Sequence, residues 1–191
     1  MDLRQFNKYE FSTETRSVNV QDEFMNLTAE QVRDATVEGR SRMVTVCMNL
    51  TSDFNKASAI RSHSAFLGAE VFMIGKRKFD RRGTVGSHHY NHIYQAESLV
   101  EVIDALHEDG YTVVAVDNNS DFECFPVYGV DLPEKTAFVY GEESSGLTDS
   151  DLELCDLIAY IPQWGAAPRS LNVAAAASIM MSEYARRWRA W

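Results

Sequence analysis

The stretch RSLNVAAAASIMM (residues 169–181) decides the fold of the C-terminal part of the chain. It opens a helix of small side chains directly after the strand-like run LIAYI (residues 157–161). Ser170 and Asn172 stand at the start of this helix, and residues of their type commonly cap helices. The first N–H groups of a helix have no partner within it, so they face solvent or a ligand. The junction therefore predicts a plain helix cap or a ligand site.

Apolar runs and helix-like stretches alternate along the rest of the chain. Strands are expected at 43–50, 70–74, 111–116, 136–140 and 157–161, and helices at 57–67, 96–110, from Thr148 and at about 171–187, with a long polar loop over 75–91. This alternation is typical of an α/β domain with a mostly parallel sheet flanked by helices. In such sheets ligands bind beyond the C-terminal strand ends, so polar residues that follow a strand are candidate site residues.

The beginning of the chain is interpreted separately. Residues 1–40 are predicted to form an N-terminal extension with one helix, and residues 41–191 the main domain. Thr28 and Gln31 have the spacing of a capping box, and Leu27 and Val32 that of a hydrophobic staple. We therefore expect a helix from Thr28 to about Gly39.

Composition places the chain among ordinary globular proteins. It has 191 residues, 45% of them hydrophobic, which is enough to close one core. No apolar run approaches the ~20 residues that span a bilayer, and the first residues lack the apolar core of a secretion signal. Three widely spaced cysteines, Cys47, Cys124 and Cys155, fit neither a disulfide framework nor a zinc site. We expect a cytoplasmic protein without a metal and without membrane contact.

Two further strand ends carry polar groups. After the first strand, SDFNKASAIRS (residues 52–62) places Asn55 near a helix start and Arg61 about one and two-thirds turns further on. Arg61 is suited to hold a phosphate, although a plain surface arginine is the alternative. After a later strand, VYGEESSGLTDSD (residues 139–151) has glycines at 141 and 146, which let the backbone approach a ligand, although a tight solvated turn has the same composition.

These three segments together resemble the signature motifs of the SpoU (TrmH) family of RNA 2′-O-ribose methyltransferases, in the SPOUT superfamily. SLNV with its small-residue helix resembles the third motif, GEESSGL the second, and the Asn–Arg spacing of NKASAIR the first. The resemblance covers about residues 44–187. It implies an α/β domain with a C-terminal deep trefoil knot, S-adenosylmethionine as methyl donor, RNA as substrate and a homodimer.

The resemblance also implies roles for individual residues. Five residues match the polar, catalytic positions of the family: Arg61, Asn55, Glu143, Ser170 and Asn172. Five match the donor-binding positions: Gly141, Leu147, Ile161, Pro162 and Leu171. The family assigns activation of the ribose hydroxyl to the arginine, but free arginine is too basic to be deprotonated at neutral pH. We therefore expect Arg61 to hold the neighbouring phosphate and hydroxyl while the proton leaves through phosphate or water.

The charge distribution bears on RNA binding. The net charge is −10 and the pI about 4.9, whereas nucleic-acid-binding surfaces are usually basic. The cations are clustered, because KRKFDRR (residues 76–82) holds five cations and one acid. This cluster is either a solvated turn or a local RNA-binding patch formed by Lys76, Arg77, Arg81 and Arg82.

Two other functions stay open at this point. The acidic balance is compatible with a catalytically inactive RNA-binding or scaffolding protein of the same fold. A dinucleotide-binding oxidoreductase is disfavoured, since G-x-G-x-x-G does not follow the first strand. For an enzyme, IPQWG before RSLNV favours tRNA over rRNA as the substrate, by resemblance to family members that methylate tRNA.

Overall fold

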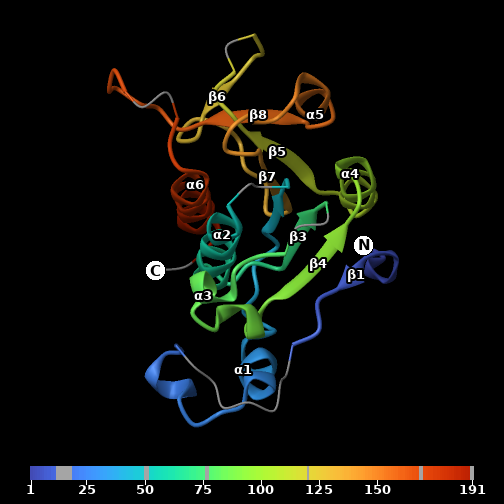
Figure 1. Cartoon of the computed structure of the whole chain (residues 1–191), viewed down its shortest axis with the longest axis vertical. Coiled ribbons are helices and arrows are strands. Elements are labelled where there is room, and N and C mark those ends of the chain that lie inside the picture. The colour runs from blue at the N-terminus through green and yellow to red at the C-terminus, as the bar shows by residue number, and fades with distance from the viewer. Residues whose placement is uncertain (12–18, 50–51, 76–77, 120, 168–169, 190–191) are drawn as a thin grey trace.

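A single sheet organises the protein (Figure 1). The computed structural model describes residues 1–11, 19–49, 52–75, 78–119, 121–167 and 170–189. Within them, eight strands pair in the order β1-β4-β3-β2-β7-β5-β8-β6, and every pair is parallel except β1–β4. The strands are β1 (Asn7–Lys8), β2 (Val44–Cys47), β3 (Glu70–Ile74), β4 (His92–Ala96), β5 (Thr112–Val116), β6 (Phe125–Pro126), β7 (Thr136–Tyr140) and β8 (Leu157–Tyr160). The predicted mostly parallel α/β sheet is confirmed.

Helices cover both faces of this sheet (Figure 1). They are α1 (Ala29–Thr36), α2 (Asp53–Ala65), α3 (Arg81–Thr84), α4 (Leu99–Glu108), α5 (Asp149–Glu153) and α6 (Val173–Trp188), with 3₁₀ turns at Leu3–Gln5, Asp22–Phe24 and Ser87–Tyr90. Neighbouring strand residues point to opposite faces, so Cys47 packs in the core beneath α2 and α6, and Val46 in the core beneath α4 and α5. Among the described residues, no helix is long and apolar enough to cross a membrane.

The positions of most elements agree with the sequence. The strands at 70–74 and 136–140 have the predicted bounds, and the Thr28–Gln31 capping box opens α1. Helix α2 begins earlier than predicted, at Asp53, because the Ser52 hydroxyl accepts a hydrogen bond from Asn55 N at 3.3 Å. This early start places Asn55 in the first turn of α2.

The predicted loop at 75–91 is wrong over most of the part that the structure describes. Asp80 caps the short helix α3, and a 3₁₀ turn follows. This region is well packed, since Thr84 and His88 are buried and their Oγ1 and Nδ1 atoms lie 2.5 Å apart. Strand β4 follows it and was not predicted, because its residues, HIYQA, include the polar His92 and Gln95 and do not form an apolar run.

The N-terminal residues contribute to the sheet. Strand β1 pairs antiparallel with β4, and the rings of Phe6 and Phe72 meet edge to face with their centroids 5.1 Å apart. The Met1 ammonium lies 2.9 Å from Asp109 Oδ1 at the end of α4. Residues 1–11 therefore cover one edge of the sheet, and the proposed division at residue 40 stays a prediction.

A buried histidine joins α2 to β2. His63 Nδ1 lies 2.9 Å from Thr45 Oγ1, and both residues are fully buried. Gly68 lies against the imidazole ring, because a Cβ atom there would stand only 2.2 Å from His63 Cε1. Burial lowers the pKa of His63 from 6.5 to about 3, so the ring is neutral in the folded protein at ordinary pH.

The stability of the protein is expected to fall in mild acid because of His63. Its folded-state pKa of about 3 lies below its ordinary value of 6.5, so between these values only the unfolded chain takes up the proton. Above about pH 6.5 the neutral, buried His63 does not lower the free energy of unfolding. As the pH falls toward 3, the free energy of unfolding decreases by about 1.4 kcal/mol per pH unit because of this residue. From pH 7 to 5, His63 alone lowers the free energy of unfolding by about 2 kcal/mol.

Urea unfolding at several pH values measures this loss. The variant His63→Asn keeps a side-chain donor near Thr45 but cannot titrate in this range. Its unfolding free energy is expected to depend less steeply on pH than that of the wild type. If the unfolding free energies of the two proteins depended equally on pH, His63 would not be the group responsible for the loss of stability.

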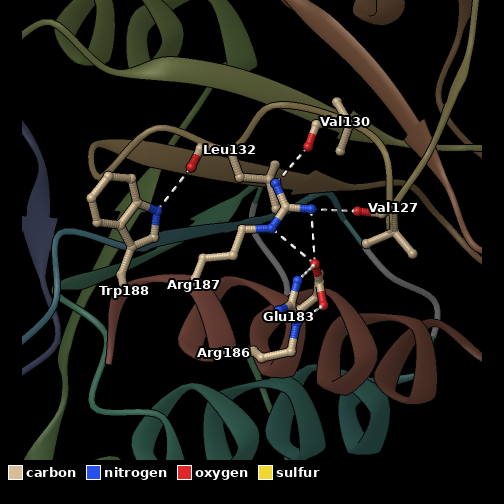
Figure 2. A network of polar contacts seen from close by, with 7 residues as sticks. All are labelled: Val127, Val130, Leu132, Glu183, Arg186, Arg187 and Trp188. Atoms are coloured by element: carbon tan, nitrogen blue, oxygen red, sulfur yellow. Dashed lines mark hydrogen bonds and ion pairs between the residues drawn. The ribbon is translucent and has the colours of Figure 1, made fainter. Parts of the chain in front are cut away.

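The end of α6 is fixed by a network of charged groups (Figure 2). Arg187 donates through Nη1 to Val130 O at 2.5 Å and through Nη2 to Val127 O at 2.9 Å. Its Nε donates to Glu183 Oε1 at 2.9 Å, and Arg186 also pairs with this carboxylate. Hydrogen bonds from Arg186 hold the pKa of Glu183 below its usual value. The segment between β6 and β7 is thereby attached to the C-terminal end of α6.

Candidate active site

A cavity of about 700 Å³ lies at the carboxyl ends of β5, β7 and β8. This volume is within the range of sites that hold a small molecule or cofactor. The lining residues come from four segments: Val116–Asn119 with Asp121, Tyr140–Leu147, Tyr160–Ile161 with Gln163, and Ser170–Val173 with Ala176. Parallel strands that end at one edge of a sheet therefore produce the cavity, as the position of the motifs predicted.

One wall of the cavity is a tight turn after β7. Glu142 and Gly146 form an antiparallel bridge, with Glu142 N donating to Gly146 O at 3.1 Å and Gly146 N to Glu142 O at 2.8 Å. Gly146 has a φ of +70°, a conformation that favours glycine. A Cβ atom at Gly141 would lie 2.4 Å from Gly146 C and 2.6 Å from Leu147 N. The turn therefore requires glycine at 141.

A chain of amide and carboxylate groups joins the three motifs. Asn172 Nδ2 donates to Asn55 Oδ1 at 3.1 Å, and Asn55 Nδ2 donates to Glu143 Oε1 at 2.8 Å. Asn172 also caps α6, because its Oδ1 accepts from Ala174 N at 2.9 Å and from Ala175 N at 3.4 Å. Asn172 therefore has two roles, as the cap of α6 and as a residue of the site. It fixes the start of α6 against α2 and the turn after β7.

Glu143 is held from two directions. Its Oε1 accepts from the Asn55 amide and, at 3.3 Å, from Ser52 N at the start of α2. Both donors come from the first motif, and Glu143 itself lines the cavity. The carboxylate is therefore oriented by α2 and stands at the boundary between the cavity and the first motif.

Arg61 does not take part in this chain. It is exposed on α2, does not line the cavity and makes no hydrogen bond or ion pair with another described residue. Six residues of helix separate it from Asn55, which is roughly 9 Å along the axis and about two-thirds of a turn around it. The segments that meet at Glu143 and Asn172 therefore leave Arg61 outside, and the first motif joins them only through its beginning, at Ser52 and Asn55.

The other predicted site residues fall into two groups. Those that line the cavity are Gly141, Leu147, Ile161, Leu171, Glu143, Ser170 and Asn172. Pro162 does not line it, although both of its neighbours, Ile161 and Gln163, do.

Four polar residues after β5 also line the cavity and were not predicted from the sequence. They are Asp117, Asn118, Asn119 and Asp121. Polar groups that directly follow a buried strand are candidate site residues in a parallel sheet. Their position after the strand at 111–116 was therefore the signal that could have identified them.

Two fully buried groups lie next to the cavity. Burial raises the pKa of the Cys47 thiol to about 12, so the thiol stays protonated at neutral pH and is not a nucleophile. Burial also raises the pKa of Tyr140 well above its usual value. Among the described residues, no group of three or more histidine, cysteine, aspartate or glutamate side chains has the arrangement of a metal site.

The predicted basic patch is described only in part, because Lys76 and Arg77 lie outside the described residues. The Arg81 guanidinium stands over the ring of Phe11, with its central carbon 5.3 Å from the ring centroid. The Arg82 side chain is 89% exposed and pairs with Asp80 at 2.7 Å. An ion pair this exposed contributes little stability, so Arg82 can exchange Asp80 for another anion.

The fold defines an α/β protein with a cavity of small-molecule size at the strand ends. The model of the SpoU rRNA Methylase family matches residues 42–182, and the chain belongs to this family.

Named relatives act on two kinds of RNA. The chain is 32% identical over 146 residues to the 23S rRNA (uridine(2479)-2'-O)-methyltransferase of Streptomyces viridochromogenes, covering 72% of this chain and 50% of that protein. It is 27% identical over 138 residues to the tRNA (guanosine(18)-2'-O)-methyltransferase of Borreliella burgdorferi, covering 71% and 62%. The chain thus spans less than two thirds of the length of either relative.

Solved structures share the fold. The SpoU methyltransferase AviRb from Streptomyces viridochromogenes, in complex with AdoMet, matches with a TM-score of 0.68 and 28% identity over 78% of this chain and 61% of that one. The TrmH/SpoU tRNA modifying enzyme of A. aeolicus matches with a TM-score of 0.73 over 83% of each chain. Its identity is 23%, so this match bears on the fold alone.

Proposed function

We propose that the chain is an S-adenosylmethionine-dependent RNA methyltransferase that modifies a ribose 2′-hydroxyl. The observation that carries the proposal is the hydrogen-bonded chain Asn172–Asn55–Glu143, which brings the three family motifs together at the cavity. The names of the relatives, which are 2′-O-methyltransferases of tRNA or rRNA, support the same reaction.

The cavity has the properties that S-adenosylmethionine requires. The donor is an adenine nucleoside joined through a sulfonium to an amino acid, and it carries two positive groups. Apolar walls from Leu147 and Ile161 suit the adenine ring. The carboxylates of Asp117 and Glu143 suit the positive groups. The glycine at 141 keeps the backbone of the turn close enough to form a wall.

The residues of the chain position the reacting hydroxyl. When bound, S-adenosylmethionine supplies an electrophilic methyl group. Glu143 and Asn55 fix each other at the mouth of the cavity, and the Asn172 cap fixes both to α6. Arg61 holds the phosphate next to the target ribose, and the hydroxyl proton leaves to phosphate or water. Positioning of this kind contributes several kcal/mol to a transfer step.

We further propose that the protein works as a homodimer. Arg61 is exposed and stands apart from the Asn172–Asn55–Glu143 chain of its own subunit. In a two-fold symmetric dimer, a patch on one subunit faces the same patch on its partner. In the proposed dimer this shared patch contains both Arg61 and the mouth of the cavity, so that Arg61 of one subunit serves the cavity of the other.

A trefoil knot in the C-terminal region is a further part of the proposal. From β8, which lies beyond β5, the chain returns to α6, which packs beside α2 and β7. This return across the neighbouring strands supports a threaded crossing. The resemblance to the family implies the same path. We also propose that residues 1–40 form an N-terminal extension and residues 41–191 the methyltransferase domain.

Tritiated methyl transfer to unmodified tRNA and rRNA tests the function. We expect a 2′-O-methylated nucleoside, identified by mass spectrometry after digestion, with tRNA as the favoured substrate. Calorimetric titration with S-adenosylmethionine separates the enzyme from an inactive scaffold, which need not bind the donor. Absence of transfer to both RNAs would refute the enzymatic proposal. The three free cysteines agree with action in a reducing cytoplasm.

Reversal of the basic cluster tests the RNA-binding surface. Changing Lys76, Arg77, Arg81 and Arg82 to glutamate is expected to weaken tRNA binding at least about tenfold and to flatten its salt dependence, because fewer counterions are released. Filter binding at several salt concentrations measures both effects. The charge reversal of Arg4 and Lys8 to glutamate, two exposed cations outside the cluster, is the control. Unchanged affinity and slope in the cluster variant would exclude this surface.

A further inference from the structure

We propose that Trp164 is a stacking platform for an unpaired RNA base beside the target nucleotide. The inference deepens the proposed function and rests on it for the identity of the ligand. Trp164 is 89% exposed, the highest exposure among the large hydrophobic side chains of the described residues. Residues 161–167, which follow β8, stand out from the body of the protein (Figure 1).

The position of Trp164 connects it to the cavity. Gln163, directly before it, and Ser170, at the other end of the loop, both line the cavity. The chain enters and leaves this loop at the cavity wall, so a group bound on Trp164 stands next to whatever occupies the cavity. Large exposed aromatic side chains on loops at such places are typical of binding sites.

Within the part of the chain that the structure describes, the indole has no partner. It makes no ring contact, cation contact or hydrogen bond with any other described residue. Tryptophan side chains are highly buried on average, and burial of one covers about 150–250 Å². Contact of this apolar area with water is unfavourable, so a partner that covers the indole gains binding free energy from its burial.

The charge of the loop favours a nucleic acid as the partner. The segment IPQWGAAPRSLNV (residues 161–173) has no acidic residue and one arginine, although the whole chain has a net charge of −10. The acidic groups of the cavity, Asp117, Asp121, Glu142 and Glu143, come from the other segments. Among the segments that form the cavity, this loop therefore repels a polyanion least, and an aromatic face in a loop without acids suits stacking on a base.

Phe54 is the other exposed aromatic side chain near the site, and it is less suited to this role. It precedes Asn55 and is 56% exposed. Its ring already packs against α3, since a Cβ atom at Gly83 would lie 3.2 Å from Phe54 Cδ2. Trp164 offers two open faces, whereas Phe54 has part of its ring covered.

Binding of short synthetic RNAs tests the inference without any methyl transfer. The probes are an oligoadenylate of about twelve nucleotides and an abasic oligomer of equal length, which keeps the phosphates and lacks the bases. Trp164→Ala is expected to weaken oligoadenylate binding about tenfold, and Trp164→Phe to restore most of it, because stacking needs an aromatic face. The abasic oligomer is expected to bind all three proteins equally.

A matched variant distinguishes base stacking at this loop from the loss of any exposed ring. Tyr128→Ala removes an aromatic side chain that is 62% exposed but does not line the cavity, and it should leave both affinities unchanged. Equal oligoadenylate binding by wild type and Trp164→Ala would overturn the inference. A change of sedimentation in Trp164→Ala would also overturn it, because Trp164 would then be a subunit contact. Failure of the wild type to bind the donor or to transfer methyl groups would refute the proposed function instead.

Discussion

Replacing Gly141 with alanine is expected to weaken S-adenosylmethionine binding by at least about tenfold. The added Cβ atom would lie 2.4 Å from Gly146 C and 2.6 Å from Leu147 N. Both atoms belong to the backbone, so no side-chain rotation relieves the overlap, and the turn between 141 and 147 must move. This turn is one wall of the cavity. Overpacking of this kind costs about 1–3 kcal/mol, which most folded proteins tolerate.

Calorimetric titration of the donor measures the effect, and circular dichroism checks that the fold persists. Gly129→Ala is the matched control, because a Cβ atom there meets only Pro126, at an ordinary contact distance of 3.6 Å. It should bind the donor like the wild type. An alanine at 141 that leaves the dissociation constant unchanged would show that the donor binds elsewhere.

Replacing Arg61 with alanine is expected to lower kcat for methyl transfer by about a hundredfold or more, with little change in donor affinity. Misplacement of a reacting group by about 1 Å has effects of this size. The donor affinity is kept, because Arg61 does not line the cavity. Arg61→Lys is expected to restore little, since lysine lacks the planar fork that grips a phosphate. Single-turnover transfer to tRNA measures the rate, and a normal rate for Arg61→Ala would contradict the proposed role.

Mixed dimers then decide which subunit Arg61 serves. Equal amounts of Arg61→Ala and Gly141→Ala chains, dissociated and reassociated, give about half mixed dimers. If Arg61 acts on the partner's cavity, each mixed dimer has one complete site, and the mixture recovers up to roughly a quarter of wild-type activity. If Arg61 acts on its own cavity, every site carries a defect and no activity returns.

The sequence predicted the fold best where strands are buried on both faces. The runs at 70–74 and 136–140 are continuous and apolar because helices cover both sides of the sheet, and they have the predicted bounds. Strand β4 lies near the edge, next to β1, and contains His92 and Gln95. The side chains of His92 and Gln95 are only half-buried, so β4 does not need an apolar run, which is the pattern that a sequence can reveal.

The candidate site was predicted in part for a similar reason. Gly141, Leu147 and Leu171 line the cavity because short motifs fix the backbone near them. Asp117 has no such motif and was missed, although it directly follows a strand. The spacing of Asn55 and Arg61 specifies their separation along a helix but not which surface each one serves. That distinction depends on how α2 packs against α6 and on any second subunit.

The place of β7 in the sheet has a consequence for biosynthesis. It lies between β2 and β5, although it is made after both of them. A nascent chain that has emerged only as far as β5 therefore holds one half-sheet, β1-β4-β3-β2, with an open edge at β2, and the single strand β5 without a neighbour. Such open strand edges are prone to pair with other chains. Once residues 136–140 leave the ribosome, β7 joins β5 to β2. Ribosome-stalled chains that end before β7 are accordingly expected to aggregate or to recruit chaperones, and longer ones are expected to stay dispersed.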